Sequence, residues 1–165
     1  MKGQPEVLKV LAGALAEEIG AAIQYMFHAE MCDNWGYKSL GGITKKRAIE
    51  EMRHAEKLIE RILYLEGAAD MPALPKIEAG KDVGGQFNMD LNGERQAVVS
   101  YNQGIAACDA AGDRGTADLL LANLHDEERH IDYLETQLDL INNKLEKWKP
   151  DLRCGHRLLS FDPPG

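Results

Sequence analysis

Two glutamates and one histidine recur at matching positions in the two halves of this 165-residue chain. Each residue of the first set lies 76 positions before its counterpart in the second set, and neighbouring apolar residues repeat at the same offset. In chain order, the six residues are Glu18, Glu51, His54, Glu94, Glu127 and His130. Two copies at one offset predict two related structural units that come together around a pseudo-two-fold axis.

Apolar residues around these positions recur with the spacing of an α-helix. Leu11, Leu15 and Tyr25, for example, fall on the same helical face as Glu18. We therefore predict an all-α fold with helices at residues 6–34, 43–66, 86–111 and 117–147. Gly41-Gly42 is expected to open the second helix, and Thr116 is expected to cap the fourth.

Residues 67–85 are rich in proline and glycine and are predicted to be a connection without regular structure. About 19 extended residues can span a helix of about 40–45 Å. The connection can therefore be a long crossover that leaves the second and third helices parallel, in an up-down-down-up four-helix bundle. The bundle is assigned to residues 1–147. Residues 148–165 form a C-terminal extension, in which Pro150 fits the first position of a short fifth helix.

The repeated pattern predicts a site for two metal ions. In a helix, a Glu and a His three positions apart converge on one ligand, as at Glu51 and His54. One Glu from each of two helices and Glu-x-x-His from the other two is the ligand set of di-iron and di-manganese carboxylate proteins. Two divalent cations would balance four buried carboxylates, and the donors suit iron or manganese, or also zinc. A single Glu-x-x-His usually lies on a solvated helix face, but the common offset argues against that reading here.

Composition restricts the remaining classes of function. A net charge of −8 argues against a general nucleic-acid-binding protein and suits the handling of cations. The three cysteines share no CxxC spacing, which favours a reduced cytoplasmic compartment. No apolar stretch has the length of a signal peptide core or a membrane span, so we expect no membrane association.

Met52 interrupts the repeat, because its counterpart is Glu128. It directly follows Glu51, so it points about 100° away from the metal site and out of the bundle. An outward methionine can be a packing or interface residue, or a haem ligand.

Several motifs resemble those of the bacterioferritins, over roughly residues 1–145. They are MKG at 1–3, IEEMRHA at 49–55, ILYLEG at 62–67, DEERHID at 126–132 and LETQLDLI at 134–141. The resemblance implies an iron-storage ferroxidase that oxidises Fe(II) with dioxygen or peroxide at an intrasubunit di-iron centre. That centre is formed by the six repeated residues, and ferric iron passes to a mineral core.

The same resemblance implies further partners. Met52 would bind a b-type haem shared between two subunits, and Tyr25 would supply an electron to the centre. Tyr25 can equally be a core tyrosine that hydrogen-bonds a buried carboxylate. The assembly implied is a homo-oligomer of 24 subunits built from haem-bridged dimers, with a small ferredoxin as reductant for iron release.

Two other functions remain open at this point. One is a non-storage di-iron oxidase or peroxidase of the rubrerythrin type, although the paired CxxC motifs typical of rubrerythrins are absent. The other is a haem-binding electron-transfer assembly in which the metal site only supports the bundle. The chain departs from the bacterioferritin pattern at Lys46 and Glu50 and in its tail, where Cys154 and His156 are more simply tail residues than metal ligands.

Overall fold

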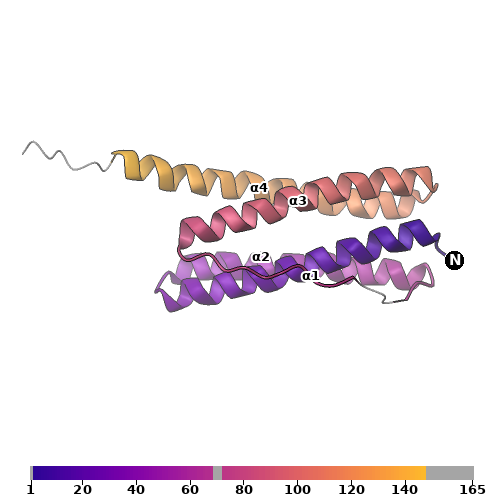
Figure 1. The fold of residues 1–165 in the computed structure, drawn as a ribbon, viewed down its shortest axis with the longest axis horizontal. Coiled ribbons are helices and arrows are strands. Elements are labelled where there is room, and N and C mark those ends of the chain that lie inside the picture. Colours follow the sequence, from indigo (N-terminus) through magenta and orange to yellow (C-terminus); the bar gives the residue numbers. More distant parts are fainter. Residues whose placement is uncertain (1, 69–71, 148–165) are drawn as a thin grey trace, which may run out of the picture.

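The computed structural model describes residues 2–68 and 72–147, which form four α-helices and no strand. They are α1 (Pro5–Asn34), α2 (Lys38–Tyr64), α3 (Val83–Ala110) and α4 (Arg114–Lys147). Figure 1 shows two hairpins, α1–α2 and α3–α4, joined by a crossover that runs back along α1. The second and third helices therefore run in the same direction, which confirms the up-down-down-up bundle. The predicted fifth helix, with Cys154 and His156, lies outside the described residues.

The hairpin between α1 and α2 is tighter than predicted. Gly36 has a φ of +88° and closes the turn, and α2 already begins at Lys38. The prediction that Gly41-Gly42 opens the second helix was wrong, because both glycines lie inside α2. A Cβ at Gly41 would lie 3.0 Å from the Ala29 carbonyl oxygen, so this glycine allows close helix approach and does not start the helix.

The starts of α3 and α4 are fixed by aspartates. The Asp82 carboxylate accepts a hydrogen bond of 2.7 Å from the Gly85 N–H, and α3 begins at Val83 rather than at residue 86. The cap predicted at Thr116 was also wrong. Asp113 precedes α4 and accepts hydrogen bonds from the Thr116 N–H (3.0 Å) and the Thr116 hydroxyl (2.7 Å).

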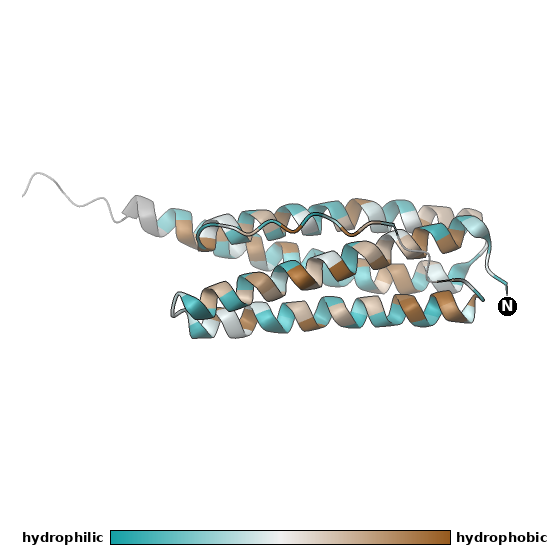
Figure 2. Cartoon of the chain, turned by 60° about the horizontal axis from the view of Figure 1, so that its bottom comes forward, coloured by the Kyte–Doolittle hydropathy of each residue, from teal (hydrophilic) through white to brown (hydrophobic). Residues whose placement is uncertain are grey.

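Apolar residues recur along all four helices (Figure 2), and the buried ones form two clusters. The larger cluster contains Leu11, Leu58 and Leu120, each of which has no exposed surface. The smaller one is built on Phe87, Leu91 and Leu134. The six predicted metal ligands lie between the two clusters along the helices. Burying one Leu stabilises the fold by about 1.5–3 kcal/mol, so the clusters can offset the cost of a polar centre.

Within residues 2–68 and 72–147, no helix combines the length and the apolar character needed to cross a lipid bilayer.

Candidate metal centre

All four helices bring their repeated residues into the middle of the bundle. Each of the six side chains retains at most 4% of its possible exposure. On α2 and α4 the Glu and His of each Glu-x-x-His pair point to the same side, as their three-residue spacing requires. The lone glutamates, Glu18 on α1 and Glu94 on α3, approach from the facing helices.

The first cluster surrounds the Nδ1 atom of His54. Carboxylate oxygens of Glu18, Glu51 and Glu127 lie 3.4, 3.2 and 3.1 Å from that atom. All four residues offer one donor atom within 4.8 Å of one another, which is close enough for a single metal ion.

The second cluster surrounds the Nδ1 atom of His130 in the same way. Carboxylate oxygens of Glu51, Glu94 and Glu127 lie 3.1, 3.2 and 2.9 Å away. Glu51 and Glu127 thus belong to both clusters, and each directs a different oxygen to each histidine. The two imidazole rings are nearly parallel, with centroids 6.3 Å apart. The arrangement has two adjacent positions for metal ions, bridged by two carboxylates.

Buried polar atoms without hydrogen-bond partners indicate whether metal ions fit this centre. In the described part of the chain, six buried side-chain polar atoms make no hydrogen bond of suitable geometry, and five of them belong to the two clusters, where they lie close to one another. These five are Glu51 Oε1, His54 Nδ1, Glu127 Oε1, Glu127 Oε2 and His130 Nδ1. Buried polar atoms without partners destabilise a fold unless a bound ligand or ion interacts with them. Oxygen donors with two imidazoles fit divalent iron or manganese, so the residues present suit the group.

The protonation equilibria of the centre are strongly shifted. Burial raises the pKa of Glu18 and of Glu94, each to about 8. Burial would also raise the pKa of Glu127, but close contacts with His130 and His54 lower it to about 2. The pKa of Glu51 is lowered for the same reason.

The two histidines show the opposite balance. Burial lowers the pKa of an imidazole, but three surrounding carboxylates raise the pKa of His54 to about 11. His130, which is also surrounded by three carboxylates, has its pKa raised to about 11 as well. Positive charge is therefore strongly favoured inside this ring of carboxylates.

The residues that surround the ligands hold them in place. The His54 Nε2 atom lies 3.0 Å from Asp126, whereas the His130 Nε2 atom lies 3.7 Å from Glu50. Glu50 and Asp126 are themselves 76 positions apart, so the repeat extends beyond the ligands. Such outer partners fix the orientation of a metal-binding imidazole.

Two tyrosines cross between the hairpins in a reciprocal way. The Tyr25 hydroxyl donates to Glu94, and the Tyr101 hydroxyl donates to Glu18. The interpretation of Tyr25 as a core tyrosine bonded to a buried carboxylate is therefore confirmed, while its role as an electron donor remains a prediction. Asn123 donates a further hydrogen bond of 3.1 Å to the Tyr101 hydroxyl.

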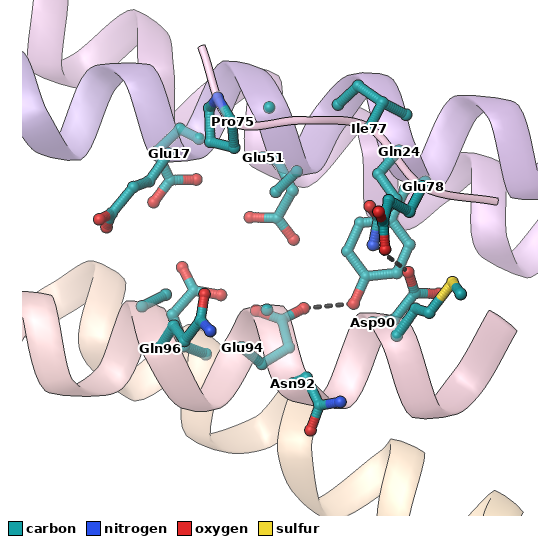
Figure 3. Close-up of a pocket in the computed structure, with 18 of the residues that line it drawn as sticks. Glu17, Gln24, Glu51, Pro75, Ile77, Glu78, Asp90, Asn92, Glu94 and Gln96 are labelled. Carbon is teal, nitrogen blue, oxygen red and sulfur yellow. Dashed lines mark hydrogen bonds between the residues drawn. The ribbon is translucent and has the colours of Figure 1, made fainter. Parts of the chain in front are cut away.

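A cavity of about 350 Å³ leads from the surface between α1 and α3 to the centre. Glu18, Glu51, Glu94 and Glu127 line its inner end. Figure 3 shows Glu51 and Glu94 reaching into it from opposite sides, beneath the crossover residues Pro75 and Ile77. The metal positions are thus accessible to a small solute.

A buried polar network beside this cavity is not indicated by the sequence pattern. Asp90 lies 2.9 Å from His28 and accepts a hydrogen bond of 3.1 Å from Gln24. The counterparts of His28 and Asp90 in the repeat are Gly104 and Ala14, so the 76-residue offset could not reveal this pair.

Met52 lies on the outside of α2, with 51% of its surface exposed. The outward direction predicted from its position next to Glu51 is confirmed, and its role as a haem ligand remains a prediction. Ile49, Ile59 and Leu63, also on α2, are exposed large apolar residues as well.

Comparison with known proteins agrees with this geometry. Residues 8–143 match the ferritin-like domain family. Bacterioferritin of Brucella melitensis is 42% identical over 141 residues, which cover 86% of this chain and 88% of that protein. Bacterioferritin of Streptomyces coelicolor is 41% identical over 141 residues, covering 86% and 84%. The structure of Mycobacterium tuberculosis bacterioferritin, BfrA, matches with a TM-score of 0.84 and 39% identity, covering 87% of this chain and 90% of that one. With this fold, this ligand geometry and these relatives, the chain belongs to the bacterioferritins of the ferritin-like family.

Proposed function

We propose that this protein is an iron-storage ferroxidase that binds two Fe(II) ions per chain and oxidises them to Fe(III). The observation that carries the proposal is the pair of fused clusters, in which Glu51 and Glu127 direct separate oxygens to two adjacent metal positions. Two ions held side by side can each lose one electron to the same oxidant molecule. Peroxide takes up both electrons and yields two hydroxide ions, and dioxygen with two protons yields one peroxide.

The charges of the residues match this substrate. Four carboxylates carry four negative charges when ionised, and two divalent ions cancel them while both histidines stay neutral. The raised pKa values of Glu18 and Glu94 mean that metal binding displaces protons from these side chains.

The cavity supplies a path for the substrate. Its inner end consists of the four ligand carboxylates, and Glu17 and Asp90 add acidic groups along its wall. An acidic path attracts divalent cations and repels anions. We infer that Fe(II) reaches the centre through this cavity.

Storage requires an assembly that can enclose a mineral. We propose a homo-oligomer of 24 chains built from dimers, in which the exposed apolar face of α2 meets its copy. A two-fold axis brings identical residues together, so two Met52 thioethers would bind one b-type haem. Thioether ligation favours reduced haem iron, and a small ferredoxin is the proposed source of electrons for iron release.

One combined experiment tests the proposal. The purified protein is sized in solution, and Fe(II) oxidation is followed by stopped-flow absorbance at increasing ratios of Fe(II) to chain. We expect a cage-sized particle and a rapid phase that saturates at about two Fe(II) per chain. Absence of any rapid phase would contradict the ferroxidase assignment. A particle no larger than a dimer, with the rapid phase intact, would instead indicate a di-iron oxidase without storage.

A further inference from the structure

Residues 75–80 of the crossover, called the strap below, cover the cavity that leads to the metal centre. Pro75, Lys76, Ile77 and Glu78 line this cavity together with side chains of α1 and α3. In Figure 3 the strap passes on one side of the cavity, and Glu94 lies on the other. The position of the strap therefore determines how wide the outer part of the cavity is.

The first attachment of the strap is a close apolar contact with α1. Gly20 faces the Pro75 ring, and a Cβ at Gly20 would lie 2.9 Å from the Cδ and Cγ atoms of Pro75. Real Cβ atoms essentially never approach another carbon this closely. The strap thus lies as near to α1 as a residue without a side chain permits.

The second attachment is a hydrogen bond at the other end of the strap. The Gly80 N–H donates to the His28 Nε2 atom at 3.2 Å. Among the described residues, the backbone of residues 72–81 forms no hydrogen bond to other backbone groups. Gly80 is also packed against the start of α3, since a Cβ there would lie 2.6 Å from the Gln86 Cα atom.

The tautomer of His28 is set by its neighbours. His28 is completely buried, and its Nδ1 atom lies 2.9 and 3.1 Å from the two oxygens of Asp90. A carboxylate only accepts hydrogen bonds, so the Nδ1 atom carries the proton. The Nε2 atom of the neutral ring is then an acceptor, which is what the Gly80 N–H requires.

We propose that Gly20 and His28 are positioning residues for the access route: by fixing both ends of the strap, they set the rate at which divalent cations reach and leave the metal centre. This rests on the proposed function, because it requires the centre to bind such cations. A cation with six waters occupies about 200 Å³, at about 30 Å³ per water. That volume is smaller than the 350 Å³ cavity, and the strap residues form part of the wall that such a cation passes.

The first test is Gly20→Ala, with Gly13→Ala as its matched control. The new methyl group at position 20 occupies space that the Pro75 ring now approaches, so the strap must move outward. Alanine also favours a helix over glycine by about 1 kcal/mol, so α1 is not weakened. Gly13 lies about two turns earlier on α1, and a Cβ there meets nothing within 4 Å. The probe is Co²⁺, whose binding is followed by its absorption and whose release is started with a chelator.

We expect Gly20→Ala to raise the rates of Co²⁺ binding and release several-fold and by the same factor. The dissociation constant should therefore stay unchanged, because the ligands are untouched. Gly13→Ala should match the wild type in both rates. A change in affinity, or slower rates in Gly20→Ala, would overturn the assignment.

The second test distinguishes the hydrogen bonds made by the two ring nitrogen atoms of His28. In His28→Asn the side-chain amide can still donate to Asp90 from near the Nδ1 position, but nothing accepts the Gly80 N–H. In His28→Gln the longer side chain can place a carbonyl oxygen near the Nε2 position and accept that hydrogen bond. We expect faster Co²⁺ binding and release in His28→Asn and rates closer to wild type in His28→Gln. Hydrogen exchange at the Gly80 amide should follow the same order.

The outcomes distinguish this inference from the function on which it rests. If the wild type binds no Co²⁺, the proposed metal centre fails and the strap assignment fails with it. If the wild type binds two Co²⁺ per chain, but Gly20→Ala and His28→Asn keep wild-type rates while Gly80 exchanges faster, only the strap assignment is overturned. Equal acceleration of binding and release in both variants supports it.

Discussion

The α1–α2 hairpin and the α3–α4 hairpin each give two glutamates and one histidine to the metal centre, but their surroundings differ. On one side the outer imidazole nitrogen of His54 is 3.0 Å from Asp126, and on the other that of His130 is 3.7 Å from Glu50. Asn123 hydrogen-bonds Tyr101, whereas its counterpart Arg47 forms an ion pair with Glu50. The atoms that face the metal positions are thus closely matched, and the atoms behind them are not.

This difference shows that the residues facing the two metal positions and the residues on the outer surface are subject to different constraints. Two metal ions of the same charge would need the same donors, and the candidate ligands repeat in both hairpins. The outer surface has different tasks on each side. Met52 on α2 corresponds to Glu128 on α4, and both are exposed. The strap lies over α1, and within residues 2–68 and 72–147 no corresponding segment lies over the other hairpin (Figure 1). The repeat is thus preserved among the candidate ligands and lost on the outer surface.

We expect the largest effect on metal binding from removing a ligand that both clusters share. Glu127→Ala removes a donor from both clusters, whereas Glu18→Ala and Glu94→Ala each affect one cluster. We expect Glu127→Ala to lose both tightly bound Co²⁺ ions and each of the other variants to keep about one, as measured by titration. Rapid Fe(II) oxidation should fall at least about 100-fold in all three, since changes to outer partners of metal ligands already cost about 10–100-fold. Wild-type kinetics in Glu127→Ala would be incompatible with the assigned centre.

The stability of metal-free protein should depend on pH in an unusual direction. The pKa values of Glu18 and Glu94 are raised from 4.5 to about 8, and those of His54 and His130 from 6.5 to about 11. All four groups hold protons more tightly when folded, so stability falls as pH rises from about 5 to about 9. The melting temperature after chelation should therefore decrease over this range, and added metal should reverse the trend.

This pH dependence also tests the similarity of the two hairpins. Glutamine cannot ionise, so Glu18→Gln and Glu94→Gln each remove one of the matched groups. Both variants should flatten the pH dependence of the melting temperature to the same extent. A clear difference between them would show that the two hairpins are electrostatically unequal.

We expect a smaller effect on metal binding from changing the residues that contact the Nε2 atoms of His54 and His130. Asp126→Asn should weaken Co²⁺ binding by about 10–100-fold, the usual cost of losing an outer partner of a metal-binding histidine. Glu50→Gln should cost less than about tenfold, because Glu50 lies 3.7 Å from His130 and its side chain is 47% exposed. Isothermal titration calorimetry of both variants measures the Co²⁺ dissociation constants, and their ratio compares the two contacts. Equal losses would mean that the 3.0 and 3.7 Å contacts are functionally equivalent.

The smallest effect on iron oxidation is expected at the outer surface. Met52→Leu should abolish the haem absorption spectrum while leaving rapid Fe(II) oxidation nearly unchanged, because Met52 and the ligands occupy different faces of α2. Glu128→Gln, at the matching position on α4, should change neither. Haem absorption retained in Met52→Leu would exclude the methionine as an axial ligand.

The sequence was sufficient to predict that six side chains cluster in the bundle, because two independent regularities coincide on them, while their role as metal ligands stays a prediction. Helical spacing places Glu51 and His54 on one face, and the 76-residue offset places the same pattern on α4. Helix ends were predicted less well. Gly41-Gly42 indicated a helix start by composition alone, whereas both glycines lie inside α2 and Gly41 allows the close contact between α1 and α2.

The polar network under the strap could not be predicted, for a different reason. Gly80 and His28 are 52 positions apart, and Asp90 and His28 are 62 apart. Neither helical spacing nor the repeat relates these positions, and only the path of the crossover brings them together. Only Asp82, three residues before Gly85, was a local indication of where the crossover ends.

The parallel course of α2 and α3 has a consequence for how the two clusters are completed. A single hairpin with one Glu and one Glu-x-x-His cannot complete either cluster by itself. Two separate copies meeting around a two-fold axis would complete both. The crossover links the two hairpins covalently, so their association is intramolecular. It therefore raises the effective concentration of one hairpin near the other. A half-length chain that pairs with a second copy around divalent metal would therefore present the same two clusters. In one joined chain the two hairpins can differ on their outer faces, as they do at Met52 and Glu128.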